Sequence, residues 1–599
     1  MSEENKKRLE IQGRYFSDAA GYLYYVEPMK NGEGWTETAI ANFTPELVEL
    51  TRRDNGFEVT DAVRFRAFRN GQYEPTVEIQ KSDILSNHPD QRFGMGCRVF
   101  IGRQYAQRLA EVMQMQCEDA EIKTIYAQTG FRDINGEKVY LNGDNSITKD
   151  GMTSAYSVEL DPDLARCYRF LDSSVAEADC YPVLLDLMEK VAPDWVIVPC
   201  LAYCFMSPLS SMLREKGAEP SFSFYIVGRT GSYKSSWAKV LLSFFGKISY
   251  AEPAPLSFLD TQNAIGRKLA LISDMPVLLD DRRPTSCADD KNRYEGTEKF
   301  VSSAIGDRAS RGRLNADSTG KTSYVARSNV FITAEEAYNN IGSSAIARSI
   351  SVELQPNTID FAKLCVLQDH TEHLNKLMQL FVQWLIVNYE DVSAGVDGRL
   401  KQFREKFASA GHPRLATAFA NLSLGYRVLL DFLVDKGALV AADADRKMDD
   451  AISIFLKMCS KQSDKVENEK PTKLFIKLLN ELIETKQVRI NDINNSTTTM
   501  GDIVNPCEAG EKTIGYRDRE KGLYYLIPSI AYTAVYQHYA KSGYTFPASM
   551  SALWKAFADE KLSMTDTGRT DKRRSINKKS GRYIALLATA IENDEEGGE

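Results

Sequence analysis

A strand, a glycine-rich loop and a helix follow one another in the run "SFSFYIVGRTGSYKSSWAKVLLSFFG", which begins at Ser221. Apolar residues from Phe222 to Val227 predict a buried strand, and the pattern from Ser235 to Phe245 predicts an amphipathic helix. This order is typical of a phosphate-binding loop, in which backbone N–H groups and a helix N-terminus converge on an anion. Strands and helices alternate on both sides of the run, which favours an α/β fold with a parallel sheet.

The loop departs from the pattern GxxxxGK[ST] at one position. Gly228, Lys234 and Ser235 fit, whereas Tyr233 stands where the pattern has glycine. Because a bulky residue with positive φ is strained, we expect Tyr233 to keep a negative φ. The lysine would reach the β and γ oxygens of ATP and the serine hydroxyl would hold Mg²⁺. The alternative is a chance Gly/Ser turn. The predicted nucleotide contacts are Gly228, Thr230, Gly231, Ser232, Tyr233, Lys234, Ser235 and Ser236.

The chain is too long for one hydrophobic core, since it has 599 residues. Its hydrophobic content of 43% and charged content of 26% are typical of a globular protein. A net charge of -8 gives no overall sign of nucleic-acid binding, so local patches must carry any such function. Ten cysteines without a CxxC pair, and a charged N-terminus, predict a cytoplasmic protein with reduced thiols.

Four regions are expected from the change of pattern along the chain. Residues 1–175 predict an α+β domain that is a candidate for DNA interaction, and residues 176–357 predict the phosphate-loop core with a preceding helical layer. Residues 358–440 predict a helical lid, and residues 441–599 predict a winged-helix-like region. The uncharged segment Trp195–Leu213 is long enough to approach a membrane span, but its prolines and serines favour a buried helix.

Polar residues end two later strands in the core. "DMPVLLDDRRP" delivers Asp280 and Asp281 to the edge where the phosphate loop lies, and "SNVFITAEE" delivers Thr333. We assign Mg²⁺ to Ser235 and Asp280, and the attacking water to Asp281 and Thr333. The alternative for Asp280 and Asp281 is that they cap a turn and have no catalytic role. The alternative for Thr333 is that its hydroxyl only ends a strand. Arg348 lies between a helix and a strand, where it is either a surface residue or a group that stabilises phosphoryl charge in a neighbouring subunit.

This order of motifs resembles an AAA+ P-loop ATPase. "TGFRDINGEKVYLNGDNSI", "FYIVGRTGSYKSS", "PVLLDD" and "TIGYRDREKGLYYLIPSIAY" together resemble the MCM-like replicative helicases of mobile genetic elements, such as phage satellites and chromosomal cassettes, over most of residues 90 to 590. The resemblance implies an ATP-dependent DNA helicase that assembles as a hexameric ring on single-stranded or forked DNA. It implies no association with a membrane. Two rivals remain: an origin-binding initiator that recruits a host helicase, and an ATPase that remodels proteins.

Two basic stretches are candidates for contact with DNA. The resemblance assigns Lys321 to a hairpin that projects into the channel of the ring, with Arg311 and Arg313 at its base. The second stretch, "GRTDKRRSINKKSGRY", follows a helix and precedes an apolar strand, as a basic wing does. The alternative for both is a solvated surface. The residues proposed from this stretch are Arg573, Arg574, Lys578 and Lys579.

Overall fold

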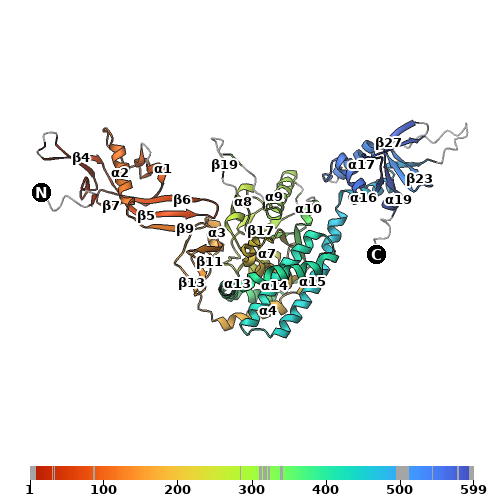
Figure 1. Cartoon of the computed structure of the whole chain (residues 1–599), viewed down its shortest axis with the longest axis horizontal. Helices are drawn as coiled ribbons and strands as arrows, with labels where there is room; N and C mark the ends of the chain where they lie inside the picture. The colour runs from red at the N-terminus through yellow and green to blue at the C-terminus, as the bar shows by residue number, and fades with distance from the viewer. Residues whose placement is uncertain are drawn as a thin grey trace.

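The structure is a computed structural model (Figure 1). It describes residues 9–592 except 12, 30–31, 33, 85–87, 284, 286, 309–312, 315–319, 322–323, 337–341, 494–511, 542–543 and 577–578. Arg311 and Lys578 of the predicted DNA contacts therefore lie outside the described residues. Figure 1 shows a strand-rich N-terminal part, a central part of helices around a sheet, and a C-terminal module beyond the long helix α15.

The N-terminal part contains three sheets. β1–β4 form an antiparallel sheet, β10–β13 form a second one, and the third runs β14-β9-β5-β6-β7 with β8 paired to β6. The Asn135-Gly136 turn joins β10 to β11 with positive φ at both residues, as a tight hairpin requires. The elements are β1 (Leu9–Ile11), β2 (Tyr15–Ser17), β3 (Leu23–Pro28), β4 (Trp35–Ala41), β5 (Thr44–Asp54), β6 (Val59–Arg69), β7 (Gln72–Tyr73), β8 (Val77–Gln80), α1 (Lys81–Ile84), η2 (Pro89–Arg92), α2 (Tyr105–Cys117), β9 (Ile122–Tyr126), β10 (Gly130–Ile134), β11 (Glu137–Leu141), β12 (Ser146–Thr148), β13 (Gly151–Thr153) and β14 (Ser157–Val158).

The central sheet has five parallel strands in the order β16-β17-β20-β15-β21. Every residue of β15 and β20 is buried, because helices cover both faces of the sheet. β20 lies between β15 and β17, so the carboxyl ends of all three strands meet at one edge. The elements are β15 (Ser223–Gly228), α7 (Lys234–Leu242), β16 (Leu256–Ser257), α8 (Gln262–Leu271), β17 (Pro276–Arg282), α9 (Ala288–Gly306), β18 (Arg313–Leu314), β19 (Gly320–Lys321), β20 (Asn329–Ala334), α10 (Ser343–Ile346) and β21 (Ser349–Leu354).

Helices before and after the sheet complete the central core. Two of them, Asp194–Glu215 and Pro413–Asp435, are long and apolar enough to span a membrane, but 94% and 78% of their apolar windows are buried inside the protein. The first includes the expected buried layer, and the second packs directly against it. The helices are α3 (Pro162–Cys167), α4 (Glu177–Lys190), α5 (Asp194–Met206), η3 (Ser207–Leu209), α6 (Ser210–Glu215), α11 (Phe361–Asp369), α12 (Thr371–Val387), α13 (Tyr389–Phe407), η4 (Ala408–Ala410), α14 (Pro413–Asp435) and α15 (Ala441–Asn468).

The largest apolar core extends beyond the predicted core region on both sides, from Tyr140 of β11 to Val466 of α15. The β10–β11 hairpin thus packs on the central part. The nine cysteines in the described part of the chain are all free thiols.

The C-terminal module has its own apolar core, to which α16, α17, α18, α19 and one face of a six-stranded sheet contribute. The sheet runs β22-β23-β24-β27-β25, and β26 pairs with β27. The basic stretch expected as a loop forms this β26–β27 hairpin, because alternate residues such as Ile576 point into the module. The elements are α16 (Pro471–Glu484), β22 (Val488–Asp492), β23 (Lys512–Asp518), β24 (Leu523–Leu526), α17 (Pro528–Lys541), α18 (Met550–Asp559), β25 (Ser563–Met564), β26 (Lys572–Ile576), β27 (Lys579–Leu587) and α19 (Ala588–Glu592).

Candidate nucleotide site and nucleic-acid surfaces

The glycine-rich loop joins β15 to α7 and is closed by a turn. The N–H of Ser232 donates to the carbonyl of Arg229 at 3.1 Å. A Cβ on Gly228 would lie 2.3 Å from Ser232 Oγ and 2.8 Å from the carbonyl oxygen of Leu354, so only glycine fits there. Gly231 has a φ of 88°, which also favours glycine. The two glycines therefore shape the loop.

Tyr233 adopts a left-handed backbone, with φ 61° and ψ 18°, so the expectation of a negative φ is wrong. Its carbonyl accepts the N–H of Trp237 at 2.8 Å, and Tyr233 is therefore the N-cap residue of α7. A non-glycine residue pays about 1–2 kcal/mol for this conformation. The Tyr233 ring stacks on Phe361 of α11, with centroids 5.1 Å apart, and such a pair contributes about 0.5–1.5 kcal/mol. The demands of helix entry and this contact override the local backbone preference.

Ser235, Asp280 and Thr333 come together at the carboxyl edge of the sheet. The hydroxyl of Ser235 donates to Asp280 Oδ1 at 2.9 Å, and the hydroxyl of Thr333 donates to the same oxygen. Thr333 Oγ1 in turn accepts the N–H of Asp281 at 2.9 Å. The helix after the loop and the ends of β17 and β20 thus supply one hydrogen-bonded group.

This group fits a magnesium ion. Two oxygens on neighbouring corners of an octahedral Mg²⁺ site, with bonds of about 2.0–2.1 Å, lie about 2.9 Å apart. The Ser235 and Asp280 oxygens have this separation. Among the described residues there is no cluster of three or more His, Cys, Asp or Glu that could hold a metal. Mg²⁺ at this edge would complete its shell with phosphate oxygens and water, as it commonly does.

Asp281 does not point to the same place as Asp280. The strand register shifts between Leu279 and Arg282, and Asp281 has a φ of 73°. Its carboxylate forms an ion pair with Arg283, whose side chain is 68% exposed. Position 281 is therefore a bulge that aims its carboxylate away from the Ser235–Asp280 pair.

Lys234 is nearly buried, and its partner is a residue that sequence analysis did not select. Its Nζ lies 3.9 Å from Glu335 Oε1, and the same oxygen accepts the hydroxyl of Thr230. Glu335 is the first residue after β20, in the run "ITAEE" that also carries Thr333. The sequence carried a signal for Glu335: a carboxylate directly after the strand that ends near Thr333 must also lie at the edge of the sheet where the phosphate loop lies.

A second residue that sequence analysis did not select is Glu298 of α9. It is fully buried, accepts Arg282 Nε at 2.8 Å and accepts the Tyr225 hydroxyl at 2.9 Å. Burial raises the pKa of the Glu298 carboxyl above its ordinary value, while Arg282 and Tyr225 act in the opposite direction. The contact ties α9 to strands β15 and β17 beneath the candidate site.

Arg348 lies at the opposite edge of the sheet. Its carbonyl accepts the N–H of Ser223, the first residue of β15, whereas the phosphate loop follows the last residue of that strand. The guanidinium pairs with Asp307 and donates to Ser344 Oγ at 2.9 Å. Within one chain Arg348 is thus separated from the loop by the length of the strand.

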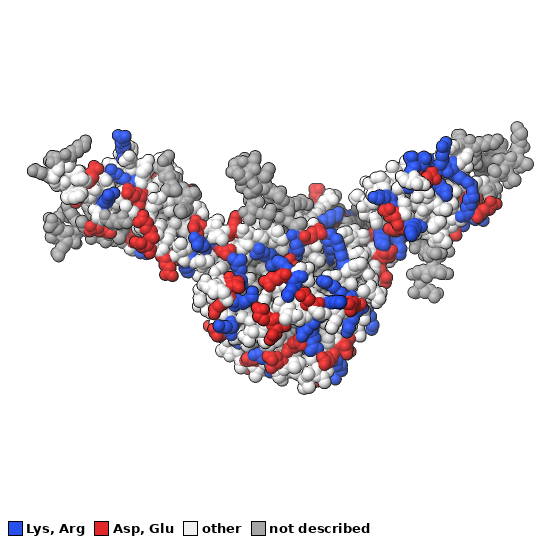
Figure 2. Space-filling view, in the orientation of Figure 1, with Lys and Arg blue, Asp and Glu red and all other residues white. Residues whose placement is uncertain are grey.

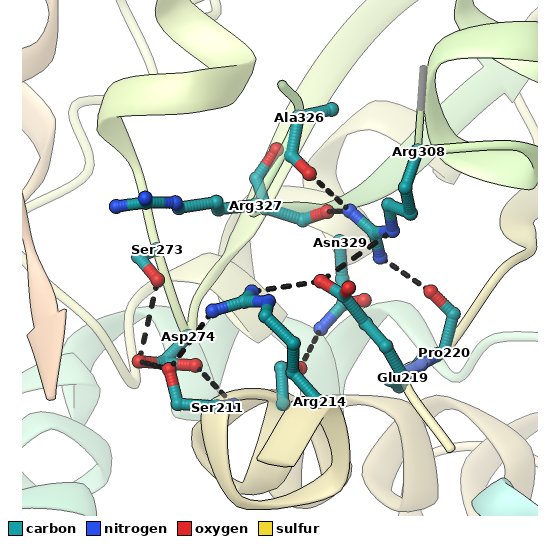
Figure 3. A network of polar contacts seen from close by, with 12 residues as sticks. Ser211, Arg214, Glu219, Pro220, Ser273, Asp274, Arg308, Ala326, Arg327 and Asn329 are labelled. Carbon is teal, nitrogen blue, oxygen red and sulfur yellow. Dashed lines mark hydrogen bonds and ion pairs between the residues drawn. The ribbon is translucent and has the colours of Figure 1, made fainter. Parts of the chain in front are cut away.

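The same edge holds a buried polar network (Figure 3). Asp274, just before β17, accepts the Ser211 N–H and hydroxyl at 2.7 Å each, and the N–H of Phe131 at 2.9 Å. Arg308 donates to the carbonyls of Ala326 and Ser328 at 3.0 and 2.9 Å. Burial raises the pKa of Asp274 and lowers that of Arg308. The network therefore holds both ends of the segment that contains β18 and β19.

Arg327 extends this network to the N-terminal part. It donates to Gln128 Oε1 at 3.1 Å and to the carbonyl of Gly56 at 3.0 Å, and its guanidinium lies 4.0 Å from the centroid of the Phe57 ring. Tyr324 adds a hydrogen bond of 3.0 Å to Glu58. The β5–β6 turn is thus fixed to the segment that follows β19.

β18 and β19 form the short antiparallel pair expected around Lys321. Arg313 pairs with Lys321, and Leu314 pairs with Gly320. Lys321 lies in the second strand, and residues 315–319, which join the two strands, are outside the described residues. The backbone therefore places Lys321 opposite Arg313 in one hairpin.

The C-terminal basic stretch divides into paired and exposed groups. Figure 2 shows Lys and Arg gathered along the C-terminal module, whereas both charges mix over the central part. Arg574 forms an ion pair of 3.2 Å with the buried Asp518. Arg582 pairs with Asp571 at 2.7 Å. Arg573 is exposed; its backbone N–H donates to Asp566 Oδ2, and among the described side chains its guanidinium donates to Ser580 Oγ and forms no ion pair, so it is the arginine of β26 best placed for a phosphate. Lys579 begins β27.

Comparison with known proteins shows the fold. A solved structure described as "SCCmec type IV Cch - active helicase" matches with a TM-score of 0.61 and 14% identity, over 98% of this chain and 99% of that chain. Two solved structures of JCV helicase, one with a bound acetamide compound, cover 42% of this chain and 72% of theirs at 14% identity, with a TM-score of 0.19 that carries no structural argument. No family model and no curated protein matches the sequence. The expected resemblance to a cassette helicase is thus confirmed at the level of the fold.

Proposed function

We propose that this protein is an ATP-dependent DNA helicase of the AAA+ type, similar to the MCM-like helicases. The observation that carries the proposal is the meeting of Lys234, Ser235, Asp280 and Thr333 at one sheet edge, in a chain whose fold matches a helicase structure along nearly its whole length. Among the described residues, these four have the chemistry of nucleotide hydrolysis: a cation for phosphate oxygens, a hydroxyl and a carboxylate for Mg²⁺, and a hydroxyl for water.

The residues of the site act as follows. The N–H groups from Thr230 to Ser236 face the phosphates of ATP, and Lys234 leaves Glu335 to reach the β and γ oxygens. Ser235 and Asp280 hold Mg²⁺, which when bound neutralises charge on those oxygens. Thr333 orients the attacking water. Because Asp281 points toward Arg283, Glu335 is the better placed carboxylate to accept the proton of that water.

The same proposal includes roles for Arg348, the lid helices, the C-terminal module and the hairpin. Arg348 serves the site of a neighbouring subunit, since it lies at the far edge of its own sheet. α11–α14 act as the lid and the C-terminal module as a winged-helix-like DNA contact. The chain works as a hexameric ring in the cytoplasm, with Lys321 and Arg313 of the hairpin on the DNA backbone.

Strand displacement on a forked duplex tests the proposal. The natural protein should unwind with ATP and Mg²⁺, Lys234→Ala should lose ATPase and unwinding, and Lys321→Ala should lose only unwinding. Lys401→Ala, at an exposed lysine of α13, is the matched control and should retain both. ATPase without unwinding in the natural protein would favour the initiator, and ATPase indifferent to DNA and to Lys321→Ala would favour protein remodelling.

A further inference from the structure

An aromatic pair, one ring half-buried and the other exposed, lies beside the phosphate loop. Tyr233, the residue that departs from the loop pattern, sends its ring to Phe361 at the start of α11, with centroids 5.1 Å apart and planes inclined by 23°. Phe361 is 56% exposed, although it is a large apolar side chain. The stack helps to hold Tyr233 in its left-handed backbone, but the hydrolysis described above uses neither ring.

The position of Phe361 is fixed by its neighbours in the chain. Asp360 caps α11 by accepting the N–H of Lys363 at 3.1 Å, and its own N–H donates to the carbonyl of Val191 at 2.9 Å. Ile359 is buried, with 2% exposure, and anchors the segment on its other side. The ring at 361 is thus held at the surface on a rigid support rather than on a mobile loop.

The pair lies where a nucleotide would extend from the loop. Tyr233 stands between Ser232 and Lys234, so its backbone belongs to the phosphate cradle while its ring reaches toward α11. α11 also contacts α7, the helix that begins at Lys234. A nucleotide with its phosphates in the loop must place its base within one ribose of it, and an exposed aromatic face binds a base by stacking.

We propose that Tyr233 and Phe361 form a stacking platform for the purine base of the nucleotide whose phosphates the loop binds. This inference rests on the proposed function, because it requires the loop to hold a nucleotide. Stacking recognises the area of a ring rather than its hydrogen-bond pattern. Purine triphosphates therefore bind more tightly than pyrimidine triphosphates, and ATP and GTP depend on the platform to a similar extent.

Calorimetric titration of the full-length protein with MgATP and with inorganic tripolyphosphate separates the base from the phosphates. Phe361→Ala should raise the Kd of ATP by about 10-fold, within the roughly 5- to 150-fold range of base stacking, and leave the Kd of tripolyphosphate within twofold. Phe361→Tyr should restore ATP affinity. Val366→Ala, at another exposed apolar residue of α11, should change neither ligand.

Three results would overturn the platform, and they differ in meaning. An equal loss for ATP and tripolyphosphate would show that the pair only shapes the loop. Unchanged ATP affinity in Phe361→Ala would show that the base lies elsewhere. If the natural protein bound neither ligand, the proposed nucleotide site would fail as well.

Tyr233→Gly restores the loop pattern, so it should keep tripolyphosphate binding while it lowers ATP affinity.

Discussion

Two aspartates lie near opposite ends of β17, and their surroundings suit them to different roles, one structural and one in ligand binding. Asp274 precedes β17 at the amino edge of the sheet, where four protein donors surround its carboxylate: the Ser211 N–H and hydroxyl, the Phe131 N–H and the Ser273 hydroxyl. Asp280 lies near the carboxyl end of the strand, is half-buried and, within the described part of the chain, accepts hydrogen bonds only from the hydroxyls of Ser235 and Thr333. An acid whose oxygens are satisfied by the protein holds the fold, whereas an acid with free lone pairs is available to a ligand.

The same contrast extends along β20. Asn329, at its start, donates to Ser207 and Ser210 at 3.1 and 2.9 Å inside the network of Figure 3. Thr333, near its end, turns to Asp280. β20 therefore connects two groups of polar residues. We call the group around Asp274 the closed network, because its donors and acceptors bind one another, and the group of Ser235, Asp280 and Thr333 the open one, because it retains oxygens for a ligand. The closed network also holds both ends of the segment that contains Lys321.

The largest effect is expected at the open end. Asp280→Asn removes the carboxylate charge but keeps the shape, so it should lower kcat for ATP hydrolysis by about 100-fold or more, as the loss of a group that stabilises the transition state does. Steady-state phosphate release measures it. The unfolding midpoint should stay within about 2 °C of the natural protein, because Asp280 satisfies few protein donors.

The opposite result would contradict the comparison. If Asp280→Asn kept its ATPase and unfolded early, Asp280 would be structural. Asp397→Asn is the control for loss of a charge, since the Asp397 side chain is 67% exposed and pairs only at the surface.

The next effect is expected at the closed end. Asp274→Asn turns an acceptor into a donor that faces the N–H groups of Ser211 and Phe131. The free energy of unfolding of the central part should fall by about 2–3 kcal/mol. Urea unfolding followed by tryptophan fluorescence measures the shift, and an unchanged m value would show that the compactness of the states is retained. At low temperature the folded variant should keep its ATPase; early loss of ATPase would place Asp274 in the site.

The two aspartates also show what sequence can predict. Asp280 ends an apolar run after a phosphate loop, so its place at the loop edge follows from strand direction alone. Asp274 begins the same run and carries no local signal, because three of its four donors belong to Ser211 and Phe131, which lie 63 and 143 residues away in the chain. Pairing between distant segments depends on packing that no spacing rule reveals. For the same reason, the sequence did not reveal the role of Glu298 or the contact of Arg327 with the β5–β6 turn.

Local rules were also overridden. Tyr233 was expected at negative φ because of its own side chain, but the turn into α7 and the stack on Phe361 decide its backbone. The basic stretch near the C-terminus was expected as a loop because it follows a helix and precedes an apolar strand, as a wing does. Its alternation of Arg574 and Ile576 toward the module was the stronger signal, and it makes a strand.

A smaller effect is expected where the closed network meets the N-terminal part. Arg327→Lys loses the planar stack on Phe57 and one of the donations to Gln128 and Gly56. We expect the local opening free energy of the β5–β6 turn to fall by about 1–2 kcal/mol. Hydrogen exchange of residues 54–58 measures it. Arg446→Lys, at a side chain that is 69% exposed, should leave this exchange unchanged.

The smallest effect concerns pH and the closed network around Asp274. Burial raises the pKa of Asp274 in the folded protein above its unfolded value, so the folded state binds more protons between the two pKa values. The stability that Asp274 contributes is full below the unfolded pKa and is lost as the pH rises through the folded pKa. Asparagine does not titrate. The destabilisation caused by Asp274→Asn should therefore be larger near pH 5 than near pH 7.5, as urea midpoints at both pH values will show. A larger penalty at the higher pH would mean that the donors and Arg214 outweigh burial, and that the closed end is held by charge rather than by a neutral hydrogen-bonded network.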